Sequence, residues 1–196
     1  LSFDIRSREE TFRSLDSLPD EWKAIDVLVN NAGLARGYDP AYEANMDDWE
    51  EMIDTNIKGL LYVTRWAVPL MVQRKSGHII NIGSIAGKEP YARGNVYCAT
   101  KSAVAALSKS LRLELVEYNV KVSLVAPAAT ETEFSLVRFK NDAERAKKVY
   151  EGYQPLTAKD IAEVIAFVIS RPPHVNIDEV LILPTAQASS TVFHRE

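Results

Sequence analysis

The sequence predicts an α/β fold in which a parallel β-sheet is covered by helices. Short runs of β-branched and apolar residues alternate with longer segments of helical periodicity along the 196 residues. This alternation is typical of strand–helix–strand units, whose connections are right-handed. Polar residues also follow three successive strand-like runs. Together these observations favour one parallel sheet with a ligand site at its edge.

Four segments are expected to form the strands of this sheet. They are short and mostly apolar, and turn-forming residues bound them, as is typical of buried parallel strands. Pro127 ends the third, because proline has no amide proton to donate to a neighbouring strand. The expected strands span residues 25–30, 78–82, 120–125 and 180–183.

Four helices are expected around the strands. Residues 7–10 have the pattern of a capping box, which predicts a short helix that ends before Pro19. The longest periodic segment, residues 47–73, contains Pro69, where we expect a kink. Gly77 suits a stop beyond the end of this helix. The other two expected helices span residues 95–118 and 157–170.

The composition is that of an ordinary globular protein with a single domain, residues 1–196. Hydrophobic residues make up 46% of the chain and charged residues 26%, with a formal net charge of −4. This charge gives no general attraction to nucleic acid or to an anionic membrane. No apolar run reaches the roughly 20 residues that span a bilayer. The start of the chain lacks the features of a signal peptide, so we expect a cytoplasmic location.

Neither cysteine nor histidine indicates a metal site. The single cysteine, Cys98, cannot form a disulfide within the chain and is expected to be a small buried residue. His78, His174 and His194 are too scattered along the sequence to suggest a set of metal ligands. We therefore expect no bound metal.

Polar side chains gather at the carboxyl ends of the predicted strands. Asn30 and Asn31 follow the first strand, Ser84 follows the second, and Thr130 and Thr132 follow the third. In open α/β sheets, ligands bind at this edge. One such residue is an ordinary turn former, but three successive strand ends predict a ligand site.

Tyr97 and Lys101 lie four residues apart in an expected helix, so their side chains share one face of it. A nearby ammonium group stabilises a phenolate and lowers the pKa of tyrosine from its reference value of about 10. A lowered pKa suits general acid–base catalysis near neutral pH. The pair alone is weak evidence, because such pairs are common on helix surfaces. Ser84, at the end of a preceding strand, makes the combination more specific.

With these residues the sequence resembles the short-chain dehydrogenase/reductase family, in its tyrosine-dependent oxidoreductase branch. The resemblance covers essentially all 196 residues, and four motifs carry it in order: Asn30-Asn31-Ala32-Gly33, Asp54-Thr55-Asn56, Asn81-Ile82-Gly83-Ser84, and Tyr97 with Lys101. It implies a Rossmann-like, doubly wound parallel sheet. It also implies hydride transfer between a nicotinamide cofactor and an alcohol or carbonyl carbon.

The resemblance further implies a role for each matched residue. Tyr97 matches the acid–base tyrosine, Ser84 the serine that orients the substrate, Lys101 the lysine that binds the cofactor ribose, and Asn56 the asparagine that holds a proton-relay water. The residues expected to bind the cofactor are Asp4, Asn30, Ala32, Gly33, Tyr97, Lys101, Pro127 and Thr132.

Several segments narrow the resemblance to the NADP-dependent serine and 3-hydroxy acid dehydrogenases of this family. These segments are residues 48–50, 81–84, 94–97, 132–139 and the tail 183–189. The narrower resemblance implies NADP as the cofactor, with NAD not excluded, a small hydroxy acid as the substrate, and a homotetramer. Arg93, Arg138 and Lys140 are candidate cations for a substrate carboxylate, although each is equally well interpreted as a solvated surface charge. The basic stretch 138–148 is interpreted as the solvated face of a lid helix.

Two departures from the family pattern stand out. Ala128 follows Pro127 where the family has glycine, so the contact with the nicotinamide amide is expected to shift. The glycine-rich turn that receives a pyrophosphate at a helix N-terminus is missing before Asp4. We therefore expect these residues to be part of a longer enzyme and to bind NADP weakly. We also expect the strand 25–30 to have an exposed hydrophobic edge.

Three functions stay open at this point. The first is NADP-linked oxidation of a small hydroxy acid, and the second is the same chemistry on a steroid, sugar or xenobiotic carbonyl. The third is a truncated, non-catalytic dehydrogenase-like protein that assembles with partners. Intact Asn56, Ser84, Tyr97 and Lys101 favour catalysis, whereas the missing cofactor turn favours the third function. A serine hydrolase is disfavoured, because no Gly-x-Ser-x-Gly turn surrounds Ser84.

Overall fold

The computed structural model describes all 196 residues and has a parallel four-stranded sheet at its centre. The strands lie in the order β1-β2-β3-β6 and pair in parallel throughout. The predicted parallel α/β fold is confirmed, with strand boundaries within two residues of those expected. The strands are β1 (Val27–Asn30), β2 (Gly77–Ile82), β3 (Val120–Pro127) and β6 (Glu179–Ile182).

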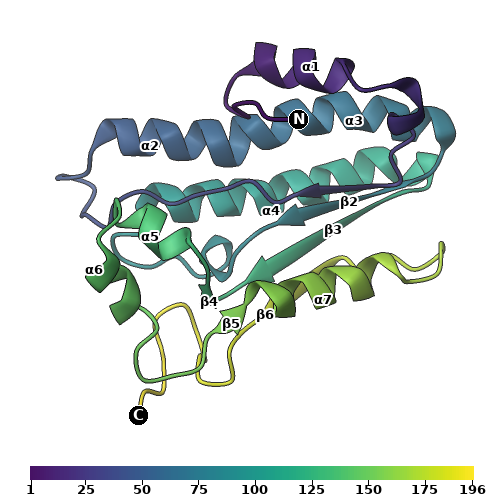
Figure 1. Cartoon of the computed structure of the whole chain (residues 1–196). Coiled ribbons are helices and arrows are strands. Elements are labelled where there is room, and N and C mark those ends of the chain that lie inside the picture. The colour runs from purple at the N-terminus through teal and green to yellow at the C-terminus, as the bar shows by residue number, and fades with distance from the viewer.

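Helices cover both faces of this sheet, as a doubly wound fold requires. Figure 1 shows α3 (Leu60–Arg74) and α4 (Asn95–Leu115) on one face and α7 (Ala158–Ile169) on the other. The helix α1 (Arg8–Asp16) packs on the outside of α3. None of the helices combines the length and the apolarity needed to cross a membrane.

The core therefore has two halves, one on each side of the sheet. Ile79 and Ile80 are neighbours in β2 and point to opposite faces, yet both are fully buried. Ile79 packs in a cluster that includes Met71 of α3, whereas Ile80 packs with Val168 of α7. Burial on both faces explains why the strands read as continuous apolar runs rather than as an alternating pattern.

Side chains define the starts of two predicted helices. The Ser7 hydroxyl accepts a hydrogen bond from the Glu10 amide at the start of α1. The Glu10 carboxylate accepts from the Asp4 amide instead of the Ser7 amide, so only half of the predicted capping box forms. At the start of α7, Thr157 and Asp160 form both bonds of a capping box.

The long helix expected over residues 47–73 is divided into three parts. The helix α2 (Met46–Ile53) continues as a π-helical segment, Asp54–Gly59, which leads into α3. Pro69 lies within α3, which continues past it to Arg74. The left-handed residue that ends α3 is Lys75, with φ of 51°, rather than a glycine.

Gly77 has a packing role at the start of β2. A Cβ atom at this position would lie 2.6 Å from the sulfur of Met71. Glycine therefore allows α3 and β2 to approach each other closely. Gly77 is needed for this contact, and the residue that ends α3 is Lys75 instead.

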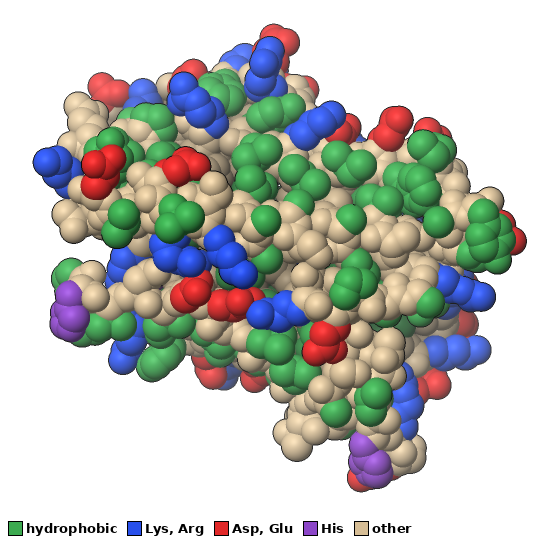
Figure 2. All heavy atoms as spheres, turned by 180° about the vertical axis from the view of Figure 1, so that it is seen from behind, with side chains coloured by type: hydrophobic (Ala, Val, Ile, Leu, Met, Phe, Trp, Pro, Cys, Tyr) green, Lys and Arg blue, Asp and Glu red, His purple; other side chains and the backbone are tan.

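The strand β1 forms one edge of the sheet, because it pairs only with β2. Val29 within it is 40% exposed, which confirms the predicted hydrophobic edge. Elsewhere the surface is mixed. On the face shown in Figure 2, Lys and Arg side chains are interspersed with Asp and Glu, with no large area of one sign.

A buried histidine at the start of β2 makes stability depend on pH. His78 Nε2 lies 2.8 Å from the Ser123 hydroxyl, which donates to the Ile177 carbonyl, and His78 Nδ1 has no partner. Burial, aided by the charge of Lys121, lowers the pKa of His78 to about 4. The unfolded chain binds this proton near its reference pKa of about 6.5, so stability falls as the pH falls from that value toward 4.

We expect this histidine to remove about 1–3 kcal/mol of stability between pH 6.5 and pH 4. Urea unfolding of the protein and of His78→Gln at several pH values measures the effect, and the variant should show a flatter dependence over this window. The exposed His174 provides the matched control, His174→Gln, which should keep the original slope. Equal slopes for His78→Gln and the unaltered protein would contradict this assignment.

Candidate active site

A cleft of about 1440 Å³ opens at the carboxyl ends of the strands. Two short helices, α5 (Phe134–Arg138) and α6 (Ala143–Lys148), and the C-terminal segment lie at this end of the sheet (Figure 1). A small second sheet, β4 (Thr130–Glu131) with β5 (Leu156–Thr157), follows β3 there. Residues from each of the three predicted strand ends line the cleft, namely Asn31, Ser84, Thr130 and Thr132. The predicted ligand edge is therefore present.

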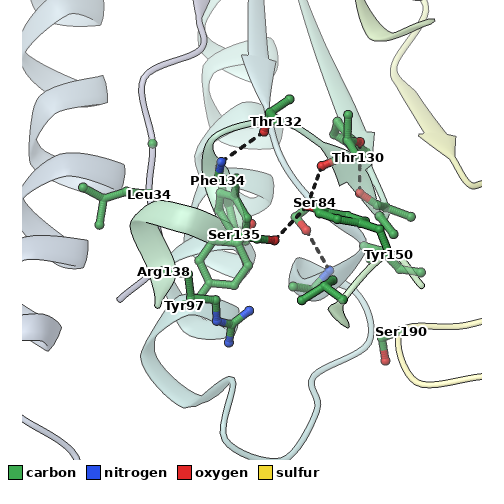
Figure 3. Close-up of a pocket in the computed structure, with 18 of the residues that line it drawn as sticks. Leu34, Ser84, Tyr97, Thr130, Thr132, Phe134, Ser135, Arg138, Tyr150 and Ser190 are labelled. Carbon is green, nitrogen blue, oxygen red and sulfur yellow. Dashed lines mark hydrogen bonds between the residues drawn. The ribbon is translucent and has the colours of Figure 1, made fainter. Parts of the chain in front are cut away.

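Ser84, Tyr97 and Lys101 all line this cleft. Ser84 follows β2 and caps a 3₁₀ turn, Ile85–Gly87, where its hydroxyl accepts a hydrogen bond from the Ala86 amide at 3.1 Å. Tyr97 and Lys101 lie one turn apart in α4 and are both buried. In Figure 3, Tyr97 and Phe134 lie together across the pocket from Ser190. The structure thus brings the predicted serine, phenol and ammonium to one cavity.

The electrostatics of Tyr97 differ from the prediction. Burial raises its pKa above the usual range, and Tyr91 acts in the same direction, whereas Ser84 and the positive charge of Arg138 oppose the shift. Lys101 is not among the groups that shift this pKa, and its ammonium group donates to the Ile82 carbonyl at 2.9 Å. The predicted lowering of the Tyr97 pKa by Lys101 is wrong for this structure, in which the phenol is firmly protonated at neutral pH.

Lys101 is a buried ammonium group without a carboxylate partner. Burial lowers its pKa to about 8, because desolvation disfavours the charged form. Its only hydrogen bond is to the Ile82 carbonyl, so the remaining two protons are available to a ligand in the cleft. Such a group is suited to binding hydroxyl oxygens.

Asn56 lies in the π-helical segment and is 2% exposed. Its amide pairs with the main chain of Leu34, accepting from the nitrogen and donating to the oxygen at 2.8 Å each. It also donates to the Thr100 hydroxyl at 3.0 Å, and Thr100 in turn donates to the Tyr97 carbonyl. Asn56 therefore joins the loop after β1 to α4, directly behind the cleft.

Gly33 lies between two of the predicted site residues. A Cβ atom there would be 3.2 Å from Asn56 Oδ1 and 3.3 Å from Lys101 Nζ. Gly33, Pro127 and Thr132 line the cleft, in agreement with their predicted placement. The absence of a side chain at Gly33 leaves room for a ligand beside the ammonium group of Lys101.

Three of the predicted cofactor residues do not line the cleft. Asn30 is buried and donates to Thr64 and Asn81, so it braces β1 against α3 and β2. Asp4 forms an exposed ion pair with Arg6 at 2.7 Å. Ala32 is exposed beside Gly33. The structure does not bring these three side chains to the cavity.

Ala128, at a position where the resemblance implies glycine, causes no backbone strain. Its φ is not positive, and its amide donates to the Ile182 carbonyl at 2.8 Å, which continues the pairing of β3 with β6. The next amide, that of Ala129, donates to the side chain of Gln187. The local conformation therefore suits alanine, and the backbone gives no support for the expected shift of the contact with the nicotinamide amide.

The basic stretch 138–148 is not one solvated lid helix. It forms the end of α5 and all of α6, separated by Lys140 and Asn141 in left-handed conformations. Arg138 is buried and lines the cleft. Arg93 also lines the cleft but is exposed. Lys140 lies outside the cleft, where it forms an ion pair with Asp48 at 2.9 Å. Arg138 is therefore not a solvated surface charge.

Sequence reasoning missed the aromatic residues around Arg138. Tyr38, Tyr91 and Phe134 line the same cleft as Tyr97. Tyr38 and Tyr91 precede the expected helix 95–118 in segments without a strand or helix pattern, where periodicity carries no information. Their position beside a family motif is the only signal that could have identified them.

Gly87 controls how closely the 3₁₀ turn packs on α4. A Cβ atom at this position would lie 2.7 Å from both the carbonyl carbon and the oxygen of Lys101, and the Gly87 carbonyl accepts from Ser102. Because both contacts involve backbone atoms, Gly87→Ala must move the turn that carries Ser84 or the helix that carries Lys101.

We expect Gly87→Ala to lower the free energy of unfolding by about 1–3 kcal/mol, the usual cost of overpacking, and to reduce turnover. Chemical denaturation and steady-state kinetics measure the two effects. Ala92→Ser, at an exposed position of the same loop, is the control and should change neither. Unaltered stability and turnover in Gly87→Ala would show that the turn is free to shift.

The family model for short chain dehydrogenases matches residues 1–143, and the chain belongs to this family. It is 52% identical over 186 residues to the NADP-dependent 3-hydroxy acid dehydrogenase of Salmonella typhi, covering 94% of this chain and 75% of that protein. It is 50% identical over 189 residues to a probable NADP-dependent dehydrogenase of Haemophilus influenzae, covering 96% of this chain and 75% of that protein.

A solved structure gives the same result. The closed form of a serine dehydrogenase complexed with NADP⁺ superposes with a TM-score of 0.95 at 48% identity, covering 100% of this chain and 80% of that chain. The predicted family and its Rossmann-like fold are therefore confirmed.

Proposed function

We propose that this protein is an oxidoreductase that transfers hydride between NADP(H) and a small hydroxy acid, such as serine or a 3-hydroxy acid. The observation that carries the proposal is the meeting of Ser84, Tyr97 and Lys101 in one cleft at the strand ends. Two similar proteins, an NADP-dependent 3-hydroxy acid dehydrogenase and a serine dehydrogenase complexed with NADP⁺, support the choice of cofactor and substrate.

The residues of the cleft fit a nicotinamide nucleotide. Lys101 offers two free protons to ribose hydroxyls, and Gly33 leaves the space beside it open. Pro127 and Thr132 line the wall that follows β3. When bound, the nicotinamide supplies or accepts the hydride, and the protein supplies alignment and electrostatics.

The chain's own residues then handle the substrate oxygen and its proton. Ser84 holds the oxygen by a hydrogen bond. Tyr97, whose pKa is raised by burial, is a protonated phenol at neutral pH and donates its proton to that oxygen when a carbonyl is reduced. In the reverse direction Tyr97 first releases its proton to solvent, and the resulting phenolate accepts the proton of the alcohol. Asn56, whose side-chain amide is bonded to Leu34 and Thr100 behind the cleft, supports the proton relay by fixing these segments.

Substrate-dependent NADPH formation tests the proposal. Serine and 3-hydroxybutyrate are compared with a steroid alcohol, a sugar and a xenobiotic alcohol, each at saturating NADP⁺. We expect turnover with the hydroxy acids and with NADP⁺ in preference to NAD⁺. Turnover confined to the other alcohols would favour a different carbonyl reductase. NADPH binding, measured by fluorescence, without any turnover would favour a non-catalytic assembly protein.

We further propose a homotetramer in the cytoplasm, as the resemblance to the serine and 3-hydroxy acid dehydrogenases implies. Sedimentation equilibrium measures the assembly, and fractionation of cells measures the location. A monomer at micromolar concentration would contradict the first part of this proposal.

A further inference from the structure

Arg138 is a buried cation that has no carboxylate partner in the protein. It is 9% exposed, and none of the ion pairs of the structure involves it. Its Nε donates to the Gly37 carbonyl at 3.2 Å, and its Nη1 donates to the Tyr91 hydroxyl at 2.8 Å. Its Nη2 makes no hydrogen bond within the protein. A buried guanidinium group that lacks a counter-ion is costly, so this arrangement has to be explained.

The guanidinium group is held rigidly among three aromatic rings. Its central carbon lies 5.0 Å from the ring centre of Tyr38, 5.6 Å from that of Tyr91 and 5.7 Å from that of Tyr97. The amide of Gly37 also donates back to the Arg138 carbonyl, which ties the loop after β1 to α5. Aromatic faces stabilise a cation but leave its remaining N–H groups free. The group is thus oriented in advance and keeps a donor for a ligand.

The charge of the cleft favours an anion. Apart from one carboxylate, Glu133, every charged residue that lines it is basic, namely Arg93, Lys101, Arg138, Arg145, Lys148 and Arg195. The chain as a whole has a net charge of −4, so this cavity is opposite in sign to the average of the molecule. Among these cations, Arg138 is the buried residue that packs over the ring of Tyr97. It is therefore placed to act close to the reacting oxygen.

We propose that Arg138 forms the subsite that binds the carboxylate of the substrate, with the hydroxyl carbon of a short hydroxy acid directed toward Tyr97 and Ser84. This assignment rests on the proposed function and names the group that selects acids over neutral alcohols. A carboxylate completes the donors of the guanidinium group and supplies its missing counter-charge. A short-chain acid can bridge the separation between Arg138 and the Tyr97 ring (Figure 3).

The test compares an acid with its neutral ester in the same variants. The kcat/KM values for 3-hydroxybutyrate and for methyl 3-hydroxybutyrate are measured with the unaltered protein, Arg138→Gln, Arg138→Lys and Arg93→Gln. The ratio of the two values is independent of the fraction of folded enzyme, because that fraction multiplies both. A loss of stability in a variant therefore leaves the comparison valid.

Arg138→Gln should lower this ratio by about 50-fold or more, mainly through KM for the acid, because a buried charged hydrogen bond is lost. The ratio for Arg138→Lys should lie between the ratios for the unaltered protein and for Arg138→Gln, because lysine keeps the charge but lacks the planar fork. Arg93→Gln, which removes an exposed cation of the same cleft, should change the ratio by less than about 3-fold, as expected for a screened surface charge. An unchanged ratio in Arg138→Gln would overturn the proposal, as would a weakened affinity for NADPH as its only effect.

A binding measurement separates this proposal from the proposed function. If the unaltered protein turns over no hydroxy acid, the proposed function fails, and calorimetric binding of 3-hydroxybutyrate then tests Arg138 alone. Binding that is present in the unaltered protein and lost in Arg138→Gln supports the carboxylate subsite. Equal binding by both proteins, or no binding by the unaltered protein, rejects it.

Discussion

Replacing Tyr97 with phenylalanine is expected to lower kcat by about 10³-fold or more, since general acid–base catalysis typically contributes 10²–10⁴. The phenol is the proton donor of the proposed reaction and lies in the cleft with Ser84 and Lys101. The phenylalanine ring keeps the packing of Tyr97 against Phe134, whose centre is 5.5 Å away. The fold should therefore survive the change, and the loss should be one of chemistry.

Single-turnover kinetics measure this loss, and thermal unfolding measures the fold. We expect Tm to change by no more than about 3 °C, which corresponds to roughly 1 kcal/mol for a chain of this size. Tyr42→Phe, at a tyrosine that is largely exposed, is the matched control and should retain full activity. Substantial turnover in Tyr97→Phe would remove this residue from the mechanism.

Lys101→Met is expected to make the protein more stable and much less active. The buried ammonium has a pKa near 8, below its reference value of about 10.4, so at pH 7 its charge costs stability. Methionine has a similar shape and no charge to desolvate. After allowing for the donor that Ile82 loses, we expect a gain of about 1–2 kcal/mol at pH 7. Turnover should fall about 10²-fold or more, because an oriented contact with the cofactor is lost.

The pH dependence gives this prediction a specific sign. The unfolded chain keeps the Lys101 proton up to its reference pKa, whereas the folded protein releases it near pH 8. The unaltered protein therefore gains stability as the pH rises from about 8 to about 10.4, and the advantage of Lys101→Met shrinks over that window. Urea unfolding of both proteins at pH 7 and pH 10 measures the difference in their stability. Lys109→Met, on the exposed side of α4, is the control and should show no such change. An advantage that is constant with pH would contradict the assignment.

The sheet and the site edge could be predicted because their signals are local. Strands such as Gly77–Ile82 are buried on both faces and appear as apolar runs, and the residues that follow them share one edge by the geometry of parallel pairing. The resemblance in the motifs then assigned Ser84, Tyr97 and Lys101 to the same place, where the structure puts them.

What could not be predicted depends on contacts between distant segments. The Tyr97 pKa rises because burial outweighs the opposing effects of Ser84 and Arg138, and burial depends on α5 folding over the phenol. The isolation of Arg138 from carboxylates is equally a tertiary property, since Glu131, Glu133 and Asp142 lie nearby in sequence but none of them forms an ion pair with it. The charge pattern of residues 138–148 therefore predicts a solvated helix, although Arg138 is buried.

The π-helical segment Asp54–Gly59 joins α2 to α3 and changes the direction in which their packed faces point. Upstream of it, α2 packs on α4, and downstream of it, α3 packs on β1 and β2. The wider turn holds one residue more than a regular helix would, so it rotates the two apolar stripes relative to each other and projects Asn56 inward at the junction. Deleting a single residue within this turn would restore regular winding, so one of the two stripes would lose its partner and the amide that grips Leu34 would swing away from it.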